Sequence, residues 1–203
     1  HDVTLFVCAA MLVGTSLLAT WALGVRGVVS GFVAAVTLGT TVLVGLTLVL
    51  SLFSAYGVTA MVVGQVVVLA GVLAWWMAVG KPRPTRPEFP PRAELWGRAR
   101  AHGTVSVLLA AAGIAAVVEL VLGLTIAPNT WDSQMYHLSR VALWIQDGGV
   151  FGMDSGTAYE REYAPNGEIT YGWTVLLWDG DRFAALVPWL FSLGSGVLVY
   201  EGA

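Results

Sequence analysis

The sequence predicts an all-α protein, a bundle of helices that cross a membrane. Of its 203 residues, 57% are apolar and only 11% are charged, and the mean hydropathy is +0.74. A soluble domain carries about 25% charged residues, because its surface faces water. The 24 glycines and nine tryptophans agree with this class, since glycine is frequent in spanning helices and tryptophan collects at the lipid–water boundary. The apolar runs lack the period-two alternation of a transmembrane β-barrel, which excludes that fold.

Long stretches without charged residues give the positions of the spans. About 20 apolar residues cross a bilayer as a helix. One such helix fits between Asp2 and Arg26, and two fit between Arg26 and Lys81. A further apolar run follows the basic segment after Lys81, and another reaches almost to the end of the chain. We therefore predict spans near Leu5–Leu23, Val28–Leu52, Val58–Val79, Thr104–Ile126 and Phe183–Tyr200.

The segment 167–178 is a shorter candidate for a membrane helix. As a helix it would be about 18 Å long, against about 30 Å of hydrocarbon in a bilayer. The sequence leaves open whether it crosses the membrane or dips into it, so five or six membrane helices are expected. Because the chain begins at His1 rather than Met and its last apolar run reaches almost to Ala203, we expect a piece of a larger polytopic protein.

The basic residues predict the orientation in the membrane. Six of the ten Lys and Arg residues lie in segment 81–103, and the positive-inside rule makes that loop cytoplasmic. Its prolines favour an extended linker over a folded domain. The chain thus divides into three spans (1–80), a cytoplasmic linker (81–103) and a partial core (104–203). The loop 127–166 then lies on the extracytoplasmic side.

Polar chemistry is concentrated after the fourth span. Residues 127–182 contain eight of the 13 acidic residues. Within them, residues 131–146 predict a helix with one apolar stripe, which ends at a pair of glycines. Asp132, Tyr136 and Arg140 are expected to share another face, because residues four apart are neighbours on a helix. A tryptophan at the start of this helix and another near its end predict that it lies in the membrane interface.

This interfacial helix has a chemical and a structural interpretation. A carboxylate such as Asp132 can accept the proton of an attacking hydroxyl, and an arginine such as Arg140 can hold a phosphate through two hydrogen bonds. Together they suit transfer of a group from a lipid phosphate. In the structural alternative, Asp132 caps the helix and Arg140 anchors it at the interface. His137 is either a base or ligand or an interface residue, and no Cys/His spacing predicts a zinc site.

The sequence also resembles a known superfamily. The run WDSQMYHLSRVALWIQDGGV, followed by EREYAPNGE and GDRFAALVPWL, is similar to bacterial inner-membrane glycosyltransferases of the GT-C superfamily, akin to the protein O-mannosyltransferases and the lipid A aminoarabinose transferase. The similarity covers about Thr104–Tyr200. It implies that a sugar passes from a polyprenyl-phosphate donor to an acceptor hydroxyl at the extracytoplasmic face.

The resemblance also implies roles for individual residues. Asp132 takes the position of the proposed base, and Arg140 or Arg161 that of a phosphate contact. The other substrate-binding candidates are Tyr136, His137 and Glu168. In some branches the aspartate binds a divalent cation. Here Ser133 follows Asp132 where many members have a second acidic residue, which puts metal binding in doubt more than base catalysis.

Two other acidic positions have open interpretations. Glu119 lies in the fourth predicted span, about 10 Å from its outer end, where a charge costs somewhat less than the roughly 2.5–3.5 kcal/mol it costs at the bilayer centre. It either lines the site or bonds to a neighbouring helix. Glu162 either contacts substrate together with Arg161 or forms a local ion pair with it.

The alternative to an enzyme is a non-catalytic polytopic membrane protein, such as a transporter fragment or an assembly scaffold. A transporter places paired polar residues or broken helices near the bilayer midplane, and the first three predicted spans show almost none. A nucleic-acid partner is excluded, because the basic residues form one linker without interleaved aromatic residues.

Overall fold

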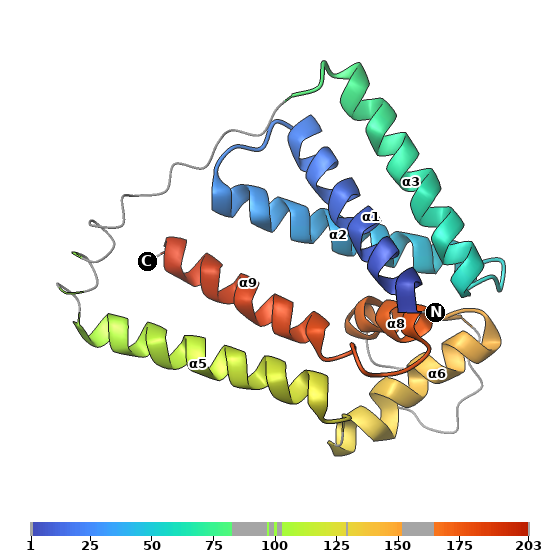
Figure 1. Ribbon diagram of the computed structural model, residues 1–203. Helices are drawn as coiled ribbons and strands as arrows, with labels where there is room; N and C mark the ends of the chain where they lie inside the picture. Colours follow the sequence, from blue (N-terminus) through green and yellow to red (C-terminus); the bar gives the residue numbers. More distant parts are fainter. Residues whose placement is uncertain are drawn as a thin grey trace.

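The chain is helical throughout its regular structure. The computed structural model describes residues 2–82, 97, 100, 103–128, 130–151 and 165–202, and these contain no strand. Figure 1 shows the arrangement of the helices. In chain order they are α1 (Asp2–Ala22), α2 (Val28–Ser51), α3 (Val58–Ala78), α5 (Gly103–Thr125), the π-helix η1 (Ser133–His137), α6 (Leu138–Asp147), α8 (Asn166–Trp178) and α9 (Leu186–Gly202).

Four of these helices, α1, α2, α3 and α5, are long and apolar enough to cross a membrane. Their bounds agree within a few residues with four of the predicted spans, which confirms a multi-pass helical membrane protein. The fifth predicted span corresponds to α9, whose described apolar stretch Leu186–Gly196 is shorter. Four candidate spans are therefore found in the described part of the chain, against the five or six expected.

The first three helices form one packed unit. α1 contacts both α2 and α3, and its small polar residues face inward. Ser16 of α1 lies so close to Gly39 of α2 that a Cβ at Gly39 would be 2.8 Å from the serine Oγ. The buried hydroxyls of Ser16 and Thr20 bond to carbonyls one turn back in their own helix, at 2.8 and 2.7 Å. Small residues thus allow the two helices to approach closely, while the Ser16 and Thr20 hydroxyls are satisfied within α1.

The short helix α8 lies inside the bundle. It packs against α1, α2, α6 and α9, and most of its residues from Glu168 to Leu177 are buried. The side chain of Gln65 from α3, in the amide orientation that satisfies both partners, accepts a hydrogen bond from Trp173 Nε1 at 2.7 Å and donates one to the Cys8 carbonyl at 3.1 Å. At 13 residues α8 is only about 20 Å long. It is an internal helix held by the four helices around it and is not among the candidate spans.

In contrast, α5 lies at the edge of the molecule (Figure 1). Among the described helices only α9 makes more than marginal contact with it. Trp189 Nε1 of α9 donates to the Ala116 carbonyl at 2.8 Å, and Ala185 approaches Gly123 closely. None of the α5 residues is buried, so this helix is exposed to the surroundings over most of its surface.

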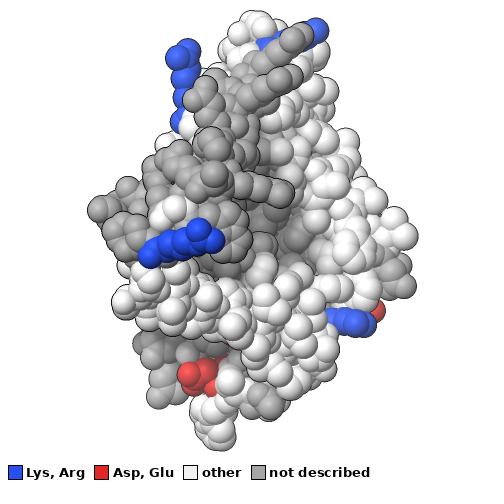
Figure 2. Space-filling model, turned by 60° about the vertical axis from the view of Figure 1, so that its left-hand side comes forward, with Lys and Arg blue, Asp and Glu red and all other residues white. Residues whose placement is uncertain are grey.

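α6 and α8 lie together at one end of the bundle, beside the first turn of α1 and the turn between α2 and α3 (Figure 1). The rings of Phe6, Trp178 and Phe183 meet there edge to face, with centroids 4.7 to 6.2 Å apart. Arg26 and Lys81 follow the other ends of α1 and α3. The face in Figure 2 is mostly white, with charged atoms in a few isolated groups. We call the end that holds α6 and α8, which carries His137, Arg140 and Glu168, the polar end of the bundle.

Candidate functional site

The helix over residues 131–147 carries most of the predicted site residues and contains one π-helical turn. In this turn the Leu138 N–H bonds to the Ser133 carbonyl, five residues back instead of four. Such a turn is wider than an α-helical one and is frequent at functional sites. It changes which side chains point the same way. Because the π turn lies between Asp132 and Arg140, the regular α-helical face expected for Asp132, Tyr136 and Arg140 is altered. His137 and Arg140, which are three residues apart, share Glu168 as a partner.

The end of this helix is fixed against the turn between α2 and α3. Gly148 has a φ of 73° and takes the left-handed conformation that ends many helices. A Cβ at this position would lie 2.5 Å from the Ser54 carbonyl oxygen, so only glycine fits. The Gly148 carbonyl accepts a bond from the Tyr56 N–H at 2.7 Å, and the Ser51 hydroxyl accepts one from the Val150 N–H at 3.0 Å. The predicted glycine stop is confirmed, and it also anchors the helix.

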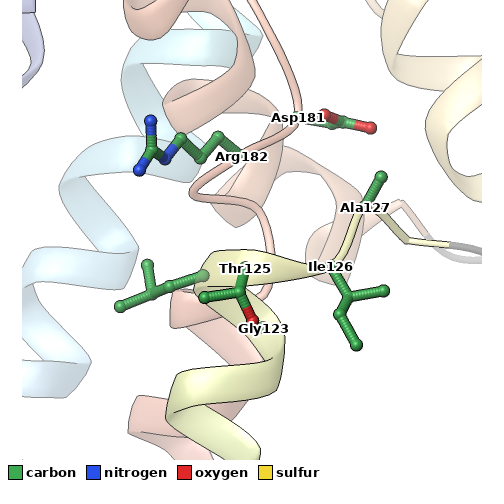
Figure 3. Close-up of a pocket in the computed structure, with 7 residues that line it drawn as sticks. Gly123, Thr125, Ile126, Ala127, Asp181 and Arg182 are labelled. Carbon is green, nitrogen blue, oxygen red and sulfur yellow. The ribbon is translucent and has the colours of Figure 1, made fainter.

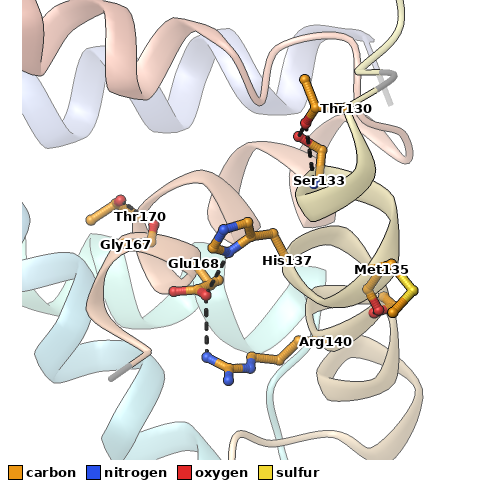
Figure 4. Close-up of polar contacts among 9 residues, drawn as sticks. Thr130, Ser133, Met135, His137, Arg140, Gly167, Glu168 and Thr170 are labelled. Atoms are coloured by element: carbon orange, nitrogen blue, oxygen red, sulfur yellow. Dashed lines mark hydrogen bonds and ion pairs between the residues drawn. The ribbon is translucent and has the colours of Figure 1, made fainter. Parts of the chain in front are cut away.

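A buried glutamate joins this helix to α8. Figure 4 shows Glu168, from the first turn of α8, between His137 and Arg140. One oxygen, Oε1, lies 2.8 Å from His137 Nδ1 and 3.2 Å from Arg140 Nη1. Glu168 is 4% exposed and Arg140 is 1% exposed, whereas the His137 side chain is 38% exposed. We call these three residues the Glu168 cluster.

The Glu168 cluster is embedded in tightly packed side chains. The Arg140 guanidinium carbon lies 5.8 Å from the centre of the Trp144 ring, within reach of a cation–π contact. The pKa of the nearby Tyr171 phenol is raised above its usual value. The main cause is burial, and the second is the negative charge of Glu168. Buried charges are stable only when they are paired and hydrogen-bonded. Arg140 and Glu168 therefore depend on each other.

His137 is the member of the Glu168 cluster that reaches the surface. A carboxylate only accepts hydrogen bonds, so its bond to Nδ1 assigns the Nδ1–H to the imidazole. The other ring nitrogen, Nε2, then lies on the far side of the ring from Glu168. The neighbouring Tyr136 ring packs on the imidazole, with centroids 4.1 Å apart. The imidazole is thus held in one orientation by a carboxylate, as in many sites that transfer protons or bind ligands.

Asp132 is exposed at the start of the same helix and does not cap it. Its structural interpretation as a helix cap is therefore wrong. That function belongs to Thr130, whose hydroxyl oxygen accepts the Ser133 N–H at 3.2 Å and also contacts the Ser133 hydroxyl at 2.5 Å (Figure 4). Because a neighbouring threonine satisfies the helix end, the Asp132 carboxylate is left at the surface.

A cavity of about 460 Å³ lies between the end of α5 and the connection from α8 to α9. It is lined by residues 123–127 and by Asp181 and Arg182. In Figure 3 the side chains of Asp181 and Arg182 point to opposite sides of this connection. One wall is therefore the mostly apolar end of a candidate span, and the other carries both charges.

Of the remaining predicted residues, those that the structure describes are not part of the Glu168 cluster. Arg161 and Glu162 lie outside the described residues. Glu119 is exposed on α5, and among the described residues no group of three or more His, Cys, Asp or Glu could hold a metal ion. Sequence reasoning missed Tyr171, although its position three residues after Glu168 places both on one face of a helix.

Comparison of the chain with protein-family models, curated proteins and solved structures found no match.

Proposed function

We propose that this protein is a membrane glycosyltransferase of the GT-C type, which moves a sugar from a polyprenyl-phosphate donor to an acceptor hydroxyl at the extracytoplasmic face. One observation carries the proposal. An exposed aspartate, Asp132, starts the helix whose next turns hold an imidazole in a fixed orientation against a buried carboxylate. Such a site has a surface carboxylate to take a proton and a rigid polar wall to receive a polar ligand.

In the proposed reaction, Asp132 takes the proton of the acceptor hydroxyl. The acceptor oxygen then forms a bond to the anomeric carbon. The bond from this carbon to the donor phosphate breaks, and its electron pair leaves with the phosphate oxygen, so the anomeric carbon is inverted. No step requires an oxidant or a resident cofactor. The attachment of Asp132 to the start of the helix would bring its carboxylate to the bound acceptor, which lowers the entropic part of the barrier to proton transfer.

The burial of Arg140 indicates that the proposed substrate-binding residues have different roles. Arg140 is 1% exposed and bonds to Glu168, so its role is to hold that carboxylate, which in turn holds His137. The half-exposed His137, with Tyr136 packed on it, would face the donor phosphate or sugar through Nε2. Arg161 stays a candidate for a direct phosphate contact. The cavity between residues 123–127 and Arg182 would accommodate the part of the donor nearest the lipid.

A transfer assay tests this proposal. Native membrane vesicles containing the protein would be given polyprenyl-phosphate mannose, glucose or arabinose with a labelled sugar, and label in the acceptor fraction would be measured. Asp132→Asn should lower transfer by about 100-fold or more, since a general base contributes 10²–10⁴-fold. Asp147→Asn is the matched control, because Asp147 is exposed at the other end of the same helix. It should keep nearly full activity.

Two results would contradict the proposal. Full activity in Asp132→Asn would remove the proposed base. Absence of transfer by the wild-type protein with all three donors, together with normal membrane insertion, would favour the non-catalytic alternative, a transporter fragment or an assembly scaffold.

A further inference from the structure

A lone glutamate is exposed on a candidate membrane span. Glu119 lies six residues before the end of α5, about 9 Å along the helix axis. Among the described residues no hydrogen bond or ion pair joins Glu119 to any other residue. A glutamate side chain is shorter than this distance, so it does not reach past the end of the helix. Acidic residues inside spans face a partner or a water-filled cavity. Glu119 is not among the residues that line the cavity at the end of α5, so this position needs a partner.

The surface of α5 near Glu119 has room for a partner helix. α9 covers the side of α5 that includes Ala116 and Gly123. Glu119 projects roughly 60° around the helix from Ala116. Ala111 and Ala115, which precede it at four-residue spacing, are exposed as well. Small residues let the backbone of a second helix approach closely, and a polar residue in the same stripe can then bond across.

We propose that this flank of α5 docks a membrane-spanning helix that carries a lysine or arginine at the depth of Glu119. An ionised carboxylate only accepts hydrogen bonds, and a cationic donor both satisfies and neutralises it. The partner is not a second copy of the described spans. α1, α2, α3, α5 and α9 contain no Lys, Arg or His, so this charge comes from another helix.

A membrane association measurement tests the proposal without any sugar substrate. The protein with Cys8→Ser and Thr104→Cys would carry one dye at the start of α5, in phosphatidylcholine vesicles. The probe is a labelled 21-residue Leu/Ala peptide with one lysine about 9 Å from its outer end, and energy transfer reports binding. A peptide with leucine in place of lysine is the matched control. We expect the lysine peptide to bind about tenfold more tightly.

Variants of Glu119 make the result specific. Glu119→Val should abolish the preference for the lysine peptide. Adding Val107→Glu to that variant moves the carboxylate about 18 Å along the same helix and should not restore the preference. Equal binding of the two peptides by the wild-type protein would overturn the proposal, as would a preference that persists in Glu119→Val. Energy transfer between two labelled copies that depends on Glu119 without any peptide would also overturn it, in favour of self-pairing.

Discussion

The helices α8 and α5 each carry one glutamate, which is buried and paired in α8 and exposed in α5. α8 is short and surrounded by protein, and its Glu168 is 4% exposed with two partners. α5 is long and packs mainly on α9, and its Glu119 is exposed. Hydropathy alone identifies α5 as a span, yet it says nothing about which helix is covered by protein. Lipid covers an apolar surface as well as protein does, but only protein supplies partners for charge.

This contrast predicts that the largest difference in the free energy of unfolding is between substitutions of the two glutamates. Glu168→Gln should lower the free energy of unfolding by about 3–5 kcal/mol, because it removes the carboxylate charge that pairs with the buried Arg140. Glu119→Gln should change it by less than about 0.5 kcal/mol. Unfolding by denaturant in detergent micelles, followed by tryptophan fluorescence, measures both. Equal changes in the free energy of unfolding would contradict the finding that Glu168 is buried and Glu119 is exposed.

A second pair of substitutions compares the polar end of the bundle with α5 through glycine. Gly148→Ala should destabilise by about 1–3 kcal/mol, because its φ is 73° and the new Cβ would meet the Ser54 carbonyl at 2.5 Å. Gly113→Ala in α5 has nothing within 4 Å of the new Cβ. It should stabilise by up to about 1 kcal/mol, since alanine is the better helix former. The same unfolding measurement applies, and opposite signs are expected.

The smallest effect concerns the phenols at the polar end. Burial raises the pKa of Tyr171 and of Tyr56 above the usual value near 10. Between the unfolded and folded pKa values the folded protein binds more protons, so stability falls as pH rises above about 10. The double substitution to phenylalanine should make this alkaline loss shallower. Unfolding measured at pH 9, 10 and 11 tests it, and an unchanged slope would contradict the burial of these hydroxyls.

Much of the fold could be predicted from the sequence because it depends on local composition. Gaps between charged residues located α1, α2, α3 and α5 within a few residues. Gly148 and Gly149 marked the end of the helix over residues 131–147, because a left-handed residue there is a local requirement. The burial of α8 could not be predicted, since that depends on which helices surround it.

The candidate site was predicted as a set of residues but not as an arrangement. His137, Arg140 and Glu168 were each singled out, yet nothing in their spacing indicated that one glutamate oxygen contacts the other two. The π turn is also invisible in the sequence, because its residues suit an α-helix equally well. Thr130 competes with Asp132 for the exposed N–H groups of the helix end, and only the folded geometry shows that Thr130 takes the bond.

The Glu168 cluster is the central claim, and a double-mutant cycle tests it most directly. The free energy of unfolding would be measured for the wild type, Arg140→Met, Glu168→Gln and the double variant. Because the two side chains bond across 28 positions of the chain, we expect a coupling energy of about 1–3 kcal/mol. A coupling energy near zero would mean that Arg140 and Glu168 are not in contact. The proposed site would then lack the buried ion pair that positions His137.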